Sequence, residues 1–132
     1  MIGPNFRPGD SIPELVKQPT RRQLVQYAGA SGDFYEMHYD DEFARSIGLS
    51  GVINHGLLKA AFLAQLVISW AGSNAALVEL RVRYQTVDFP DRSLLCRGVV
   101  TAVESTRVNL EIWTEDPDGQ RTTTGTAVLE LS

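Results

Sequence analysis

Hydrophobic residues recur at helical spacing in the first half of the chain and at alternate positions in the second half. Thr20–Gln23 fits a capping box that opens a short helix, and Asp40 fits the N-cap of a second short helix that Gly48 ends. Residues 29–39, rich in polar and aromatic side chains, are expected to form the loop between them. Residues 1–19 contain four of the six prolines and predict an extended segment.

The longest predicted helix follows His55-Gly56 and covers residues 57–72. It is apolar on almost every face, so we expect it to be buried on all sides. A sequence with helices first and at least four strands afterwards, in meander-like succession, predicts an α+β fold in which an antiparallel sheet curls around one buried helix. The strands are expected within residues 77–84, 93–104, 107–113 and 126–131.

Composition and charge narrow the class of protein. Apolar residues make up 43% of the 132 residues and charged residues 21%, which suits one globular domain over residues 1–132. A net charge of −4 offers no basic surface for nucleic acid. The apolar segment 57–72 is shorter than the roughly 20 residues that cross a bilayer, and the N-terminus lacks the apolar core of a signal peptide. The expectation is therefore a cytoplasmic protein with no membrane or nucleic-acid partner.

A carboxylate and two imidazoles lie close to the start of the long helix in sequence. Asp33 and His38 are five residues apart in a glycine-containing loop, and His55-Gly56 follows 17 residues after His38. Together they predict an acid–base site beside the free amides of a helix N-terminus, which favour negative charge.

Other interpretations of the same residues remain open on local sequence alone. Asp33 and Glu36 also fit a capping box, and His38 fits a hydrogen-bonded structural histidine. Asp33, His38 and His55 match no standard zinc spacing, so no metal is expected. The single cysteine, Cys96, cannot form an internal disulfide and is expected in the core instead of acting as a nucleophile.

The stretch YAGASGDFYEMHYDDEFARSIGLSGVINHGLL, residues 27–58, resembles the hydratase signature of the MaoC-like family. That family includes (R)-specific enoyl-CoA hydratases and bacterial 3-hydroxyacyl thioester dehydratases. Its pattern places an Asp, a His five residues later, an Asp two residues beyond and a downstream His-Gly, and Asp33, His38, Asp40 and His55-Gly56 fall in register with it. The resemblance implies a hot-dog fold, an antiparallel sheet wrapped around the long helix.

The resemblance also implies an activity, reversible hydration of 2-enoyl thioesters of CoA or acyl carrier protein without a cofactor. Asp33 and His38 would be the catalytic acid–base pair, and Gly56 with His55 would contact the thioester at the oxyanion site. The chain departs from the family at Tyr35-Glu36, where Asn-Pro is usual, and at Ala64, where some members carry a Ser. Candidates to line an acyl tunnel are the apolar residues near these positions: Phe34, Tyr35, Met37, Leu57 and Phe62.

Hot-dog proteins pair through edge strands, so a homodimer or a heterodimer with a related hot-dog chain is expected, with residues 80–84 at the exposed edge. Two other functions stay open. A hot-dog thioesterase usually carries a carboxylate on the central helix, and residues 57–72 contain none. A non-catalytic subunit of a heteromeric dehydratase would not need both Asp33 and His38.

Overall fold

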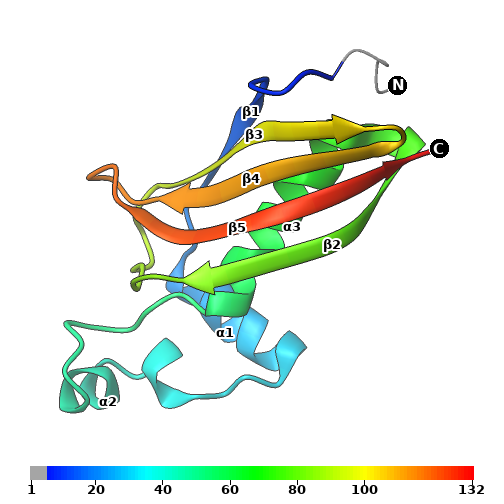
Figure 1. Cartoon of the computed structure of the whole chain (residues 1–132). Coiled ribbons are helices and arrows are strands. Elements are labelled where there is room, and N and C mark those ends of the chain that lie inside the picture. Colours follow the sequence, from blue (N-terminus) through cyan, green and yellow to red (C-terminus); the bar gives the residue numbers. More distant parts are fainter. Residues whose placement is uncertain (1–5) are drawn as a thin grey trace.

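The computed structural model describes residues 6–132, which form a five-stranded antiparallel sheet and a long helix packed against it (Figure 1). The helical elements are α1 (Arg21–Ser31), the 3₁₀ turn η1 (Glu36–His38), α2 (Asp41–Ser46), α3 (Gly56–Ala71) and the 3₁₀ turn η2 (Gly72–Asn74). The strands are β1 (Ser11–Lys17), β2 (Ala75–Tyr84), β3 (Leu94–Glu104), β4 (Arg107–Glu115) and β5 (Arg121–Leu131). The predicted α+β architecture is confirmed.

The strand order is β1-β3-β4-β5-β2, with every neighbouring pair antiparallel. Only β3, β4 and β5 form a meander, because β2 crosses to the far edge and pairs with β5. The predicted meander-like succession is therefore wrong for β2. The N-terminal extended segment also contains a strand, β1, whose register shifts between Ile12 and Leu15, around Pro13. An irregular edge strand tolerates a proline, which cannot donate to the ladder.

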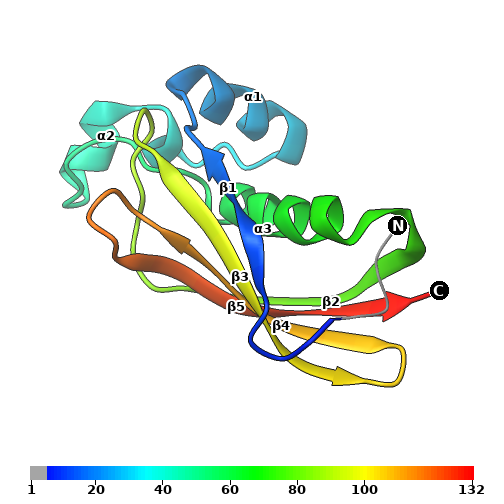
Figure 2. The same ribbon diagram turned by 90° about the horizontal axis from the view of Figure 1, so that it is seen from above.

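Helix α3 crosses one face of the sheet, and α1 and α2 lie at the end of the sheet where α3 begins (Figures 1 and 2). Eight of its residues are buried, among them Leu63 and Val67, which are fully covered. The expectation of burial on all sides is wrong, since Leu57 and Ile68 are 58% and 52% exposed. A single curved sheet covers one side of the helix, and an all-apolar sequence does not show which side that is.

The length argument against a membrane span also fails. Together α3 and η2 form a helical segment of 19 residues, Gly56–Asn74, with a mean hydropathy of 1.3, long and apolar enough to cross a membrane by length and composition. The packing of this helix is that of a core helix, because six of its eight buried residues belong to the same core cluster as residues of four strands. Here the helix is the centre of a folded core.

Both predicted helix caps are present. The Thr20 hydroxyl accepts a hydrogen bond from the Gln23 amide at 3.1 Å, and the Asp40 carboxylate accepts one from the Phe43 amide at 3.2 Å. Helix α1 runs through residues 29–31, which were expected to be loop, and ends at Gly32 with φ of 78°. This left-handed conformation favours glycine and turns the chain directly into Asp33.

Candidate active site

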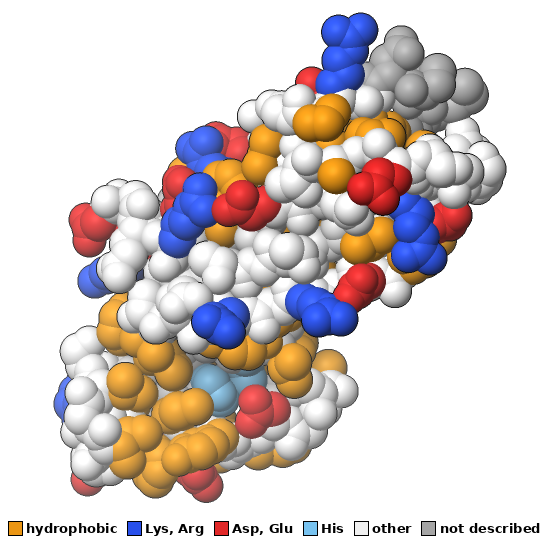
Figure 3. Space-filling model, viewed as in Figure 1, with side chains coloured by type: hydrophobic (Ala, Val, Ile, Leu, Met, Phe, Trp, Pro, Cys, Tyr) orange, Lys and Arg blue, Asp and Glu red, His pale blue; other side chains and the backbone are white. Residues whose placement is uncertain are grey.

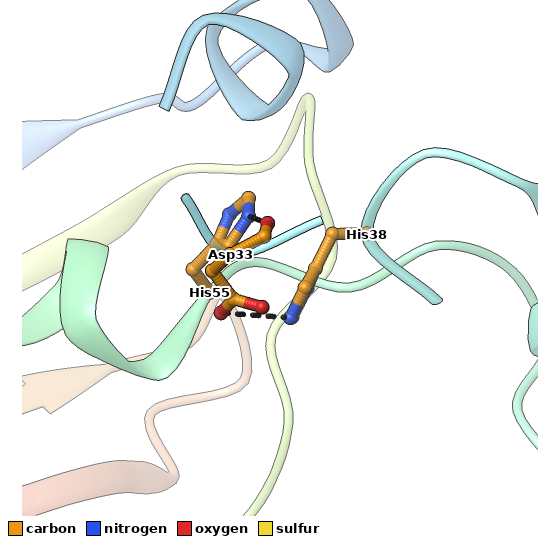
Figure 4. A group of neighbouring side chains, drawn as sticks. All are labelled: Asp33, His38 and His55. Carbon is orange, nitrogen blue, oxygen red and sulfur yellow. Dashed lines mark hydrogen bonds and ion pairs between the residues drawn. The ribbon is translucent and has the colours of Figure 1, made fainter. Parts of the chain in front are cut away.

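Asp33 and His38 come together at the start of helix α3. Gly32 ends α1 immediately before Asp33, and His38 is the last residue of the turn η1 that follows. Asp33 Oδ2 lies 3.7 Å from His38 Nε2, and Figure 4 shows the two side chains facing each other. The carboxylate is 38% exposed and the imidazole only 4%, so the pair lies at the boundary between solvent and core. At this separation a single water can contact both groups.

The second nitrogen of His38 defines the state of the ring. Nδ1 lies 2.9 Å from the backbone carbonyl oxygen of Ile53. A carbonyl only accepts, so Nδ1 carries the hydrogen and donates it. In the neutral imidazole Nε2 is then the free base, and it is the nitrogen that faces Asp33.

His55 lies behind this pair and does not line the cavity described below. Its side chain is fully buried, its ring stacks on that of His38 with centroids 3.8 Å apart, and its Nε2 donates to the backbone oxygen of Asp33 at 3.3 Å (Figure 4). From the sequence, His55 was expected to contact the substrate. In the structure its ring packs inward against His38 and Tyr27 instead of facing the cavity. It joins the Asp33 loop to the first turn of α3.

Burial, with a smaller contribution from nearby His38, lowers the pKa of His55 below its usual range. Below about pH 6.5 an unfolded chain binds a proton at this residue that the folded chain does not bind. We therefore expect the melting temperature to fall as the pH decreases through that value. A thermal melt series between about pH 5 and 7.5 measures the fall. In His55→Asn the part of this fall that comes from His55 should be missing. An unchanged dependence of the melting temperature on pH in that variant would contradict the lowered pKa of His55.

A cavity of about 460 Å³ opens beside Asp33 and His38. In Figure 3 a histidine is visible in a hollow bordered by hydrophobic side chains, with an acidic side chain next to it. The cavity is lined by η1 and the segments around it, by the first turn of α3, and by the end of β2 with the loop after it: Asp33, Met37, His38, Ile53, Asn54, Gly56, Leu57, Lys59, Tyr84, Gln85, Thr86 and Val87.

Gly56 is the first residue of α3 and lies against the ring of Tyr84. A Cβ at this position would come within 3.0 Å of two atoms of the Tyr84 ring, closer than side chains normally approach. A larger residue would require the Tyr84 ring to move by a few tenths of an ångström, so glycine lets the first turn of the helix lie this close to the end of β2 without displacing that ring. Gly56 and Leu57, in this first turn, line the same cavity as Asp33 and His38.

The tunnel candidates divide between different environments. Met37 and Leu57 line the cavity. Phe34 and Tyr35 are about half exposed, at 57% and 49%, and lie outside its lining. Phe62 is 5% exposed, belongs to the hydrophobic core and is not part of the cavity lining.

Seven cavity residues were missed from the sequence: Ile53, Asn54, Lys59, Tyr84, Gln85, Thr86 and Val87. Lys59 carried a usable signal, since it is the one charged residue in a largely apolar helix. Its partner, Asp88, lies 29 residues away, and nothing local connects the two.

The structure also bears on two other interpretations of these residues, a capping box and a metal site. Asp33 does not form the capping box with Glu36; its Oδ1 accepts instead from the Tyr35 amide at 3.4 Å. Asp33, His38 and His55 can bring ligand atoms within 4.8 Å of one another. The two stacked rings, however, are only 21° from parallel, so their in-plane lone pairs do not converge on one ion.

Cys96 is buried in the core, and burial raises the pKa of its thiol to about 12. The thiolate, which is the nucleophilic form, is therefore suppressed.

Comparison with known proteins identifies the family: residues 6–124 match the MaoC like domain, and the chain belongs to this family of hydratases and dehydratases. One relative is the 3-oxo-4,17-pregnadiene-20-carboxyl-CoA hydratase beta subunit of Mycobacterium tuberculosis, 25% identical over 94% of each chain. Another is the fatty acid synthase subunit beta of Gibberella zeae, 40% identical over 52 residues. That match covers 39% of this chain but only 2% of the synthase subunit.

Solved structures show the same hot-dog fold, as the resemblance implied. The ChsH1-ChsH2 complex from Mycobacterium tuberculosis contains a chain with a TM-score of 0.88 at 23% identity, covering 96% of this chain and 98% of that one. The (R)-hydratase from A. caviae involved in PHA biosynthesis has a TM-score of 0.89 at 22% identity, covering 98% and 100%.

Proposed function

We propose that this protein catalyses the reversible hydration of 2-enoyl thioesters to 3-hydroxyacyl thioesters, with Asp33 and His38 as the acid–base pair. The observation that carries the proposal is the 3.7 Å approach of the Asp33 carboxylate to His38 Nε2 at the wall of a cavity that also contains Gly56. Membership of a hydratase and dehydratase family supports it.

In the proposed reaction one water supplies both the hydroxyl and the proton that are added. The water lies between Asp33 and His38, its oxygen bonds to the β-carbon, and one of its protons passes to the pair. The π electrons of the carbon–carbon double bond shift toward the thioester carbonyl, giving an enolate. The pair then returns one proton to the α-carbon, which restores its own protonation state and completes the addition.

Negative charge on the enolate oxygen needs a donor, and the backbone N–H of Gly56 at the start of α3 is the proposed one. This amide belongs to the first turn of the helix, where backbone N–H groups have no intrahelical acceptor. Donors of this kind are worth roughly 10²–10³-fold in rate, so Gly56 is a main contributor in the proposal. The neutral His55 behind it holds Asp33 and His38 in place without meeting the substrate.

CoA is the proposed carrier, because the Mycobacterium tuberculosis relative that matches 94% of each chain is named as a CoA hydratase subunit.

A two-chain assembly is proposed, because related structures include two-chain complexes. The proposed contact is β2, an edge strand whose Val78 is 49% exposed. The partner is a second copy or a related chain, and light scattering of the purified protein distinguishes a dimer from a chain that awaits another subunit.

The test follows two signals from one reaction. The purified protein is incubated with crotonyl-CoA and longer 2-enoyl-CoAs while enoyl absorbance and free thiol are recorded. We expect absorbance to fall without thiol release. Thiol release would instead indicate a thioesterase, and absence of both signals, alone and with a related partner chain, would contradict the proposed catalytic function.

A further inference from the structure

Part of the cavity wall, at Asn54 and Lys59, is polar in a way that hydration chemistry does not require. Lys59 and Asp88, 2% and 5% exposed, form an ion pair of 2.9 Å between Nζ and Oδ2. Lys59 Nζ also donates to the backbone oxygen of Thr86 at 3.2 Å. These two bonds use two of the three ammonium hydrogens, and Lys59 lies in the cavity lining.

Asn54 places a side-chain amide without hydrogen-bond partners in the same wall. It is 3% exposed and lines the cavity, yet neither its Nδ2 nor its Oδ1 has a hydrogen-bond partner within the described residues. Its backbone amide donates to the Asp88 backbone oxygen at 2.8 Å, so it lies next to the ion pair. A buried amide without partners is unfavourable, and a bound group recovers that free energy when it completes the hydrogen bonds.

The charges of Lys59 and Asp88 indicate which kind of ligand group completes these hydrogen bonds. Asp88 neutralises Lys59, so this wall carries no net charge and gives no advantage to an anionic carboxylate. Lys59 has a third ammonium hydrogen beyond its two bonds, and Asn54 offers an amide donor and an amide acceptor. An uncharged oxygen satisfies these groups, either a carbonyl that accepts or a hydroxyl that accepts and donates. The remaining lining, including Met37, Ile53 and Leu57, suits the carbon skeleton that carries this oxygen.

We propose that the acyl group of the physiological substrate carries an uncharged oxygen, a hydroxyl or a ketone, which binds to Asn54 and Lys59 in this wall. Asn54 and Lys59 are thus specificity-determining residues. The inference rests on the proposed hydration of 2-enoyl thioesters and narrows the class of acyl group. A plain alkyl chain in the same place leaves the polar groups of the wall unpaired, and a site built for hydrogen bonding discriminates strongly against a substrate that lacks the matching group.

The test compares matched substrates. One set contains 2-octenoyl-CoA and its derivatives with a hydroxyl or an oxo oxygen at each of the last four carbons. We expect kcat/KM for at least one oxygenated derivative to exceed that of plain 2-octenoyl-CoA by about tenfold or more. Equal values across the series, or a preference for the plain chain, would overturn the inference and would mean that solvent satisfies Asn54. Hydration of plain 2-octenoyl-CoA tests the proposed function, and the preference among the derivatives tests the inference. Failure of one is therefore distinguishable from failure of the other.

Two variants assign the preference to this wall. Asn54→Leu removes both amide groups, and Lys59→Met with Asp88→Leu replaces the ion pair by apolar side chains without leaving a lone charge. In each we expect the ratio of oxygenated to plain kcat/KM to fall to about one-tenth of the wild-type ratio or less.

The matched control is Arg107→Met with Glu130→Gln. It removes an exposed ion pair of 2.9 Å between β4 and β5, which is outside the cavity lining. Its ratio should equal that of the wild type. A wild-type ratio in both wall variants would also overturn the inference.

Discussion

Replacing His38 with alanine should lower kcat/KM for 2-enoyl-CoA hydration by roughly 10²–10⁴-fold, and replacing Asp33 with asparagine should have an effect of similar size. The His38 variant loses the free base at Nε2, which the Nδ1 bond to Ile53 directs toward the carboxylate. The Asp33 variant keeps the shape of the side chain but loses its negative charge. Steady-state kinetics with crotonyl-CoA, together with circular dichroism to check the fold, measures both effects.

Glu36→Gln supplies the matched control for Asp33→Asn. Glu36 lies two residues before His38, and its side chain is exposed and outside the cavity lining. The same chemical change at this position should leave kcat/KM at the wild-type value. Folded Asp33→Asn or His38→Ala protein with wild-type turnover would refute the role proposed for that residue.

The second large effect concerns stability. Lys59→Met on its own should lower the free energy of unfolding by roughly 3–5 kcal/mol, because it leaves the Asp88 carboxylate buried without its partner. Adding Asp88→Leu should recover most of that loss, since the remaining side chains are apolar and similar in volume. Chemical denaturation of the wild type, the single variant and the double variant measures the difference.

An exposed ion pair gives the comparison. Arg107, 60% exposed, pairs with Glu130 across two strands, and Arg107→Met should cost about 0–1 kcal/mol. If Lys59→Met costs no more than this, or if the double variant is as unstable as the single one, the buried pair does not stabilise the fold in the manner described.

Local sequence predicted the parts of the structure that depend on local chemistry. The caps at Thr20 and Asp40, the helix that starts at Gly56, and the approach of Asp33 to His38 all follow from residues close together in the chain. The approach occurs even though Tyr35-Glu36 replaces the usual Asn-Pro, because the turn η1 still orients His38.

Features that depend on distant pairing were missed. Strand β1 contains Pro13, which argues against a strand unless it lies at an irregular edge, and the partner of β2 is β5, about 40 residues further along the chain. The contacts of Asn54 and Lys59 with Asp88 form only after the loop that follows β2 returns to the start of α3. The inward position of His55 likewise depends on its stacking on His38.

In the proposed mechanism, helix α3 couples catalysis to the integrity of the whole fold. Gly56 and Lys59 belong to its first turn, and the rest of the helix is anchored in the core through residues such as Leu63 and Val67. The proposed oxyanion donor and the proposed specificity residue on this helix therefore have no independent support that would survive melting of the sheet. Heating should abolish turnover and tertiary structure at the same midpoint, and no partly melted species should retain enzymatic competence.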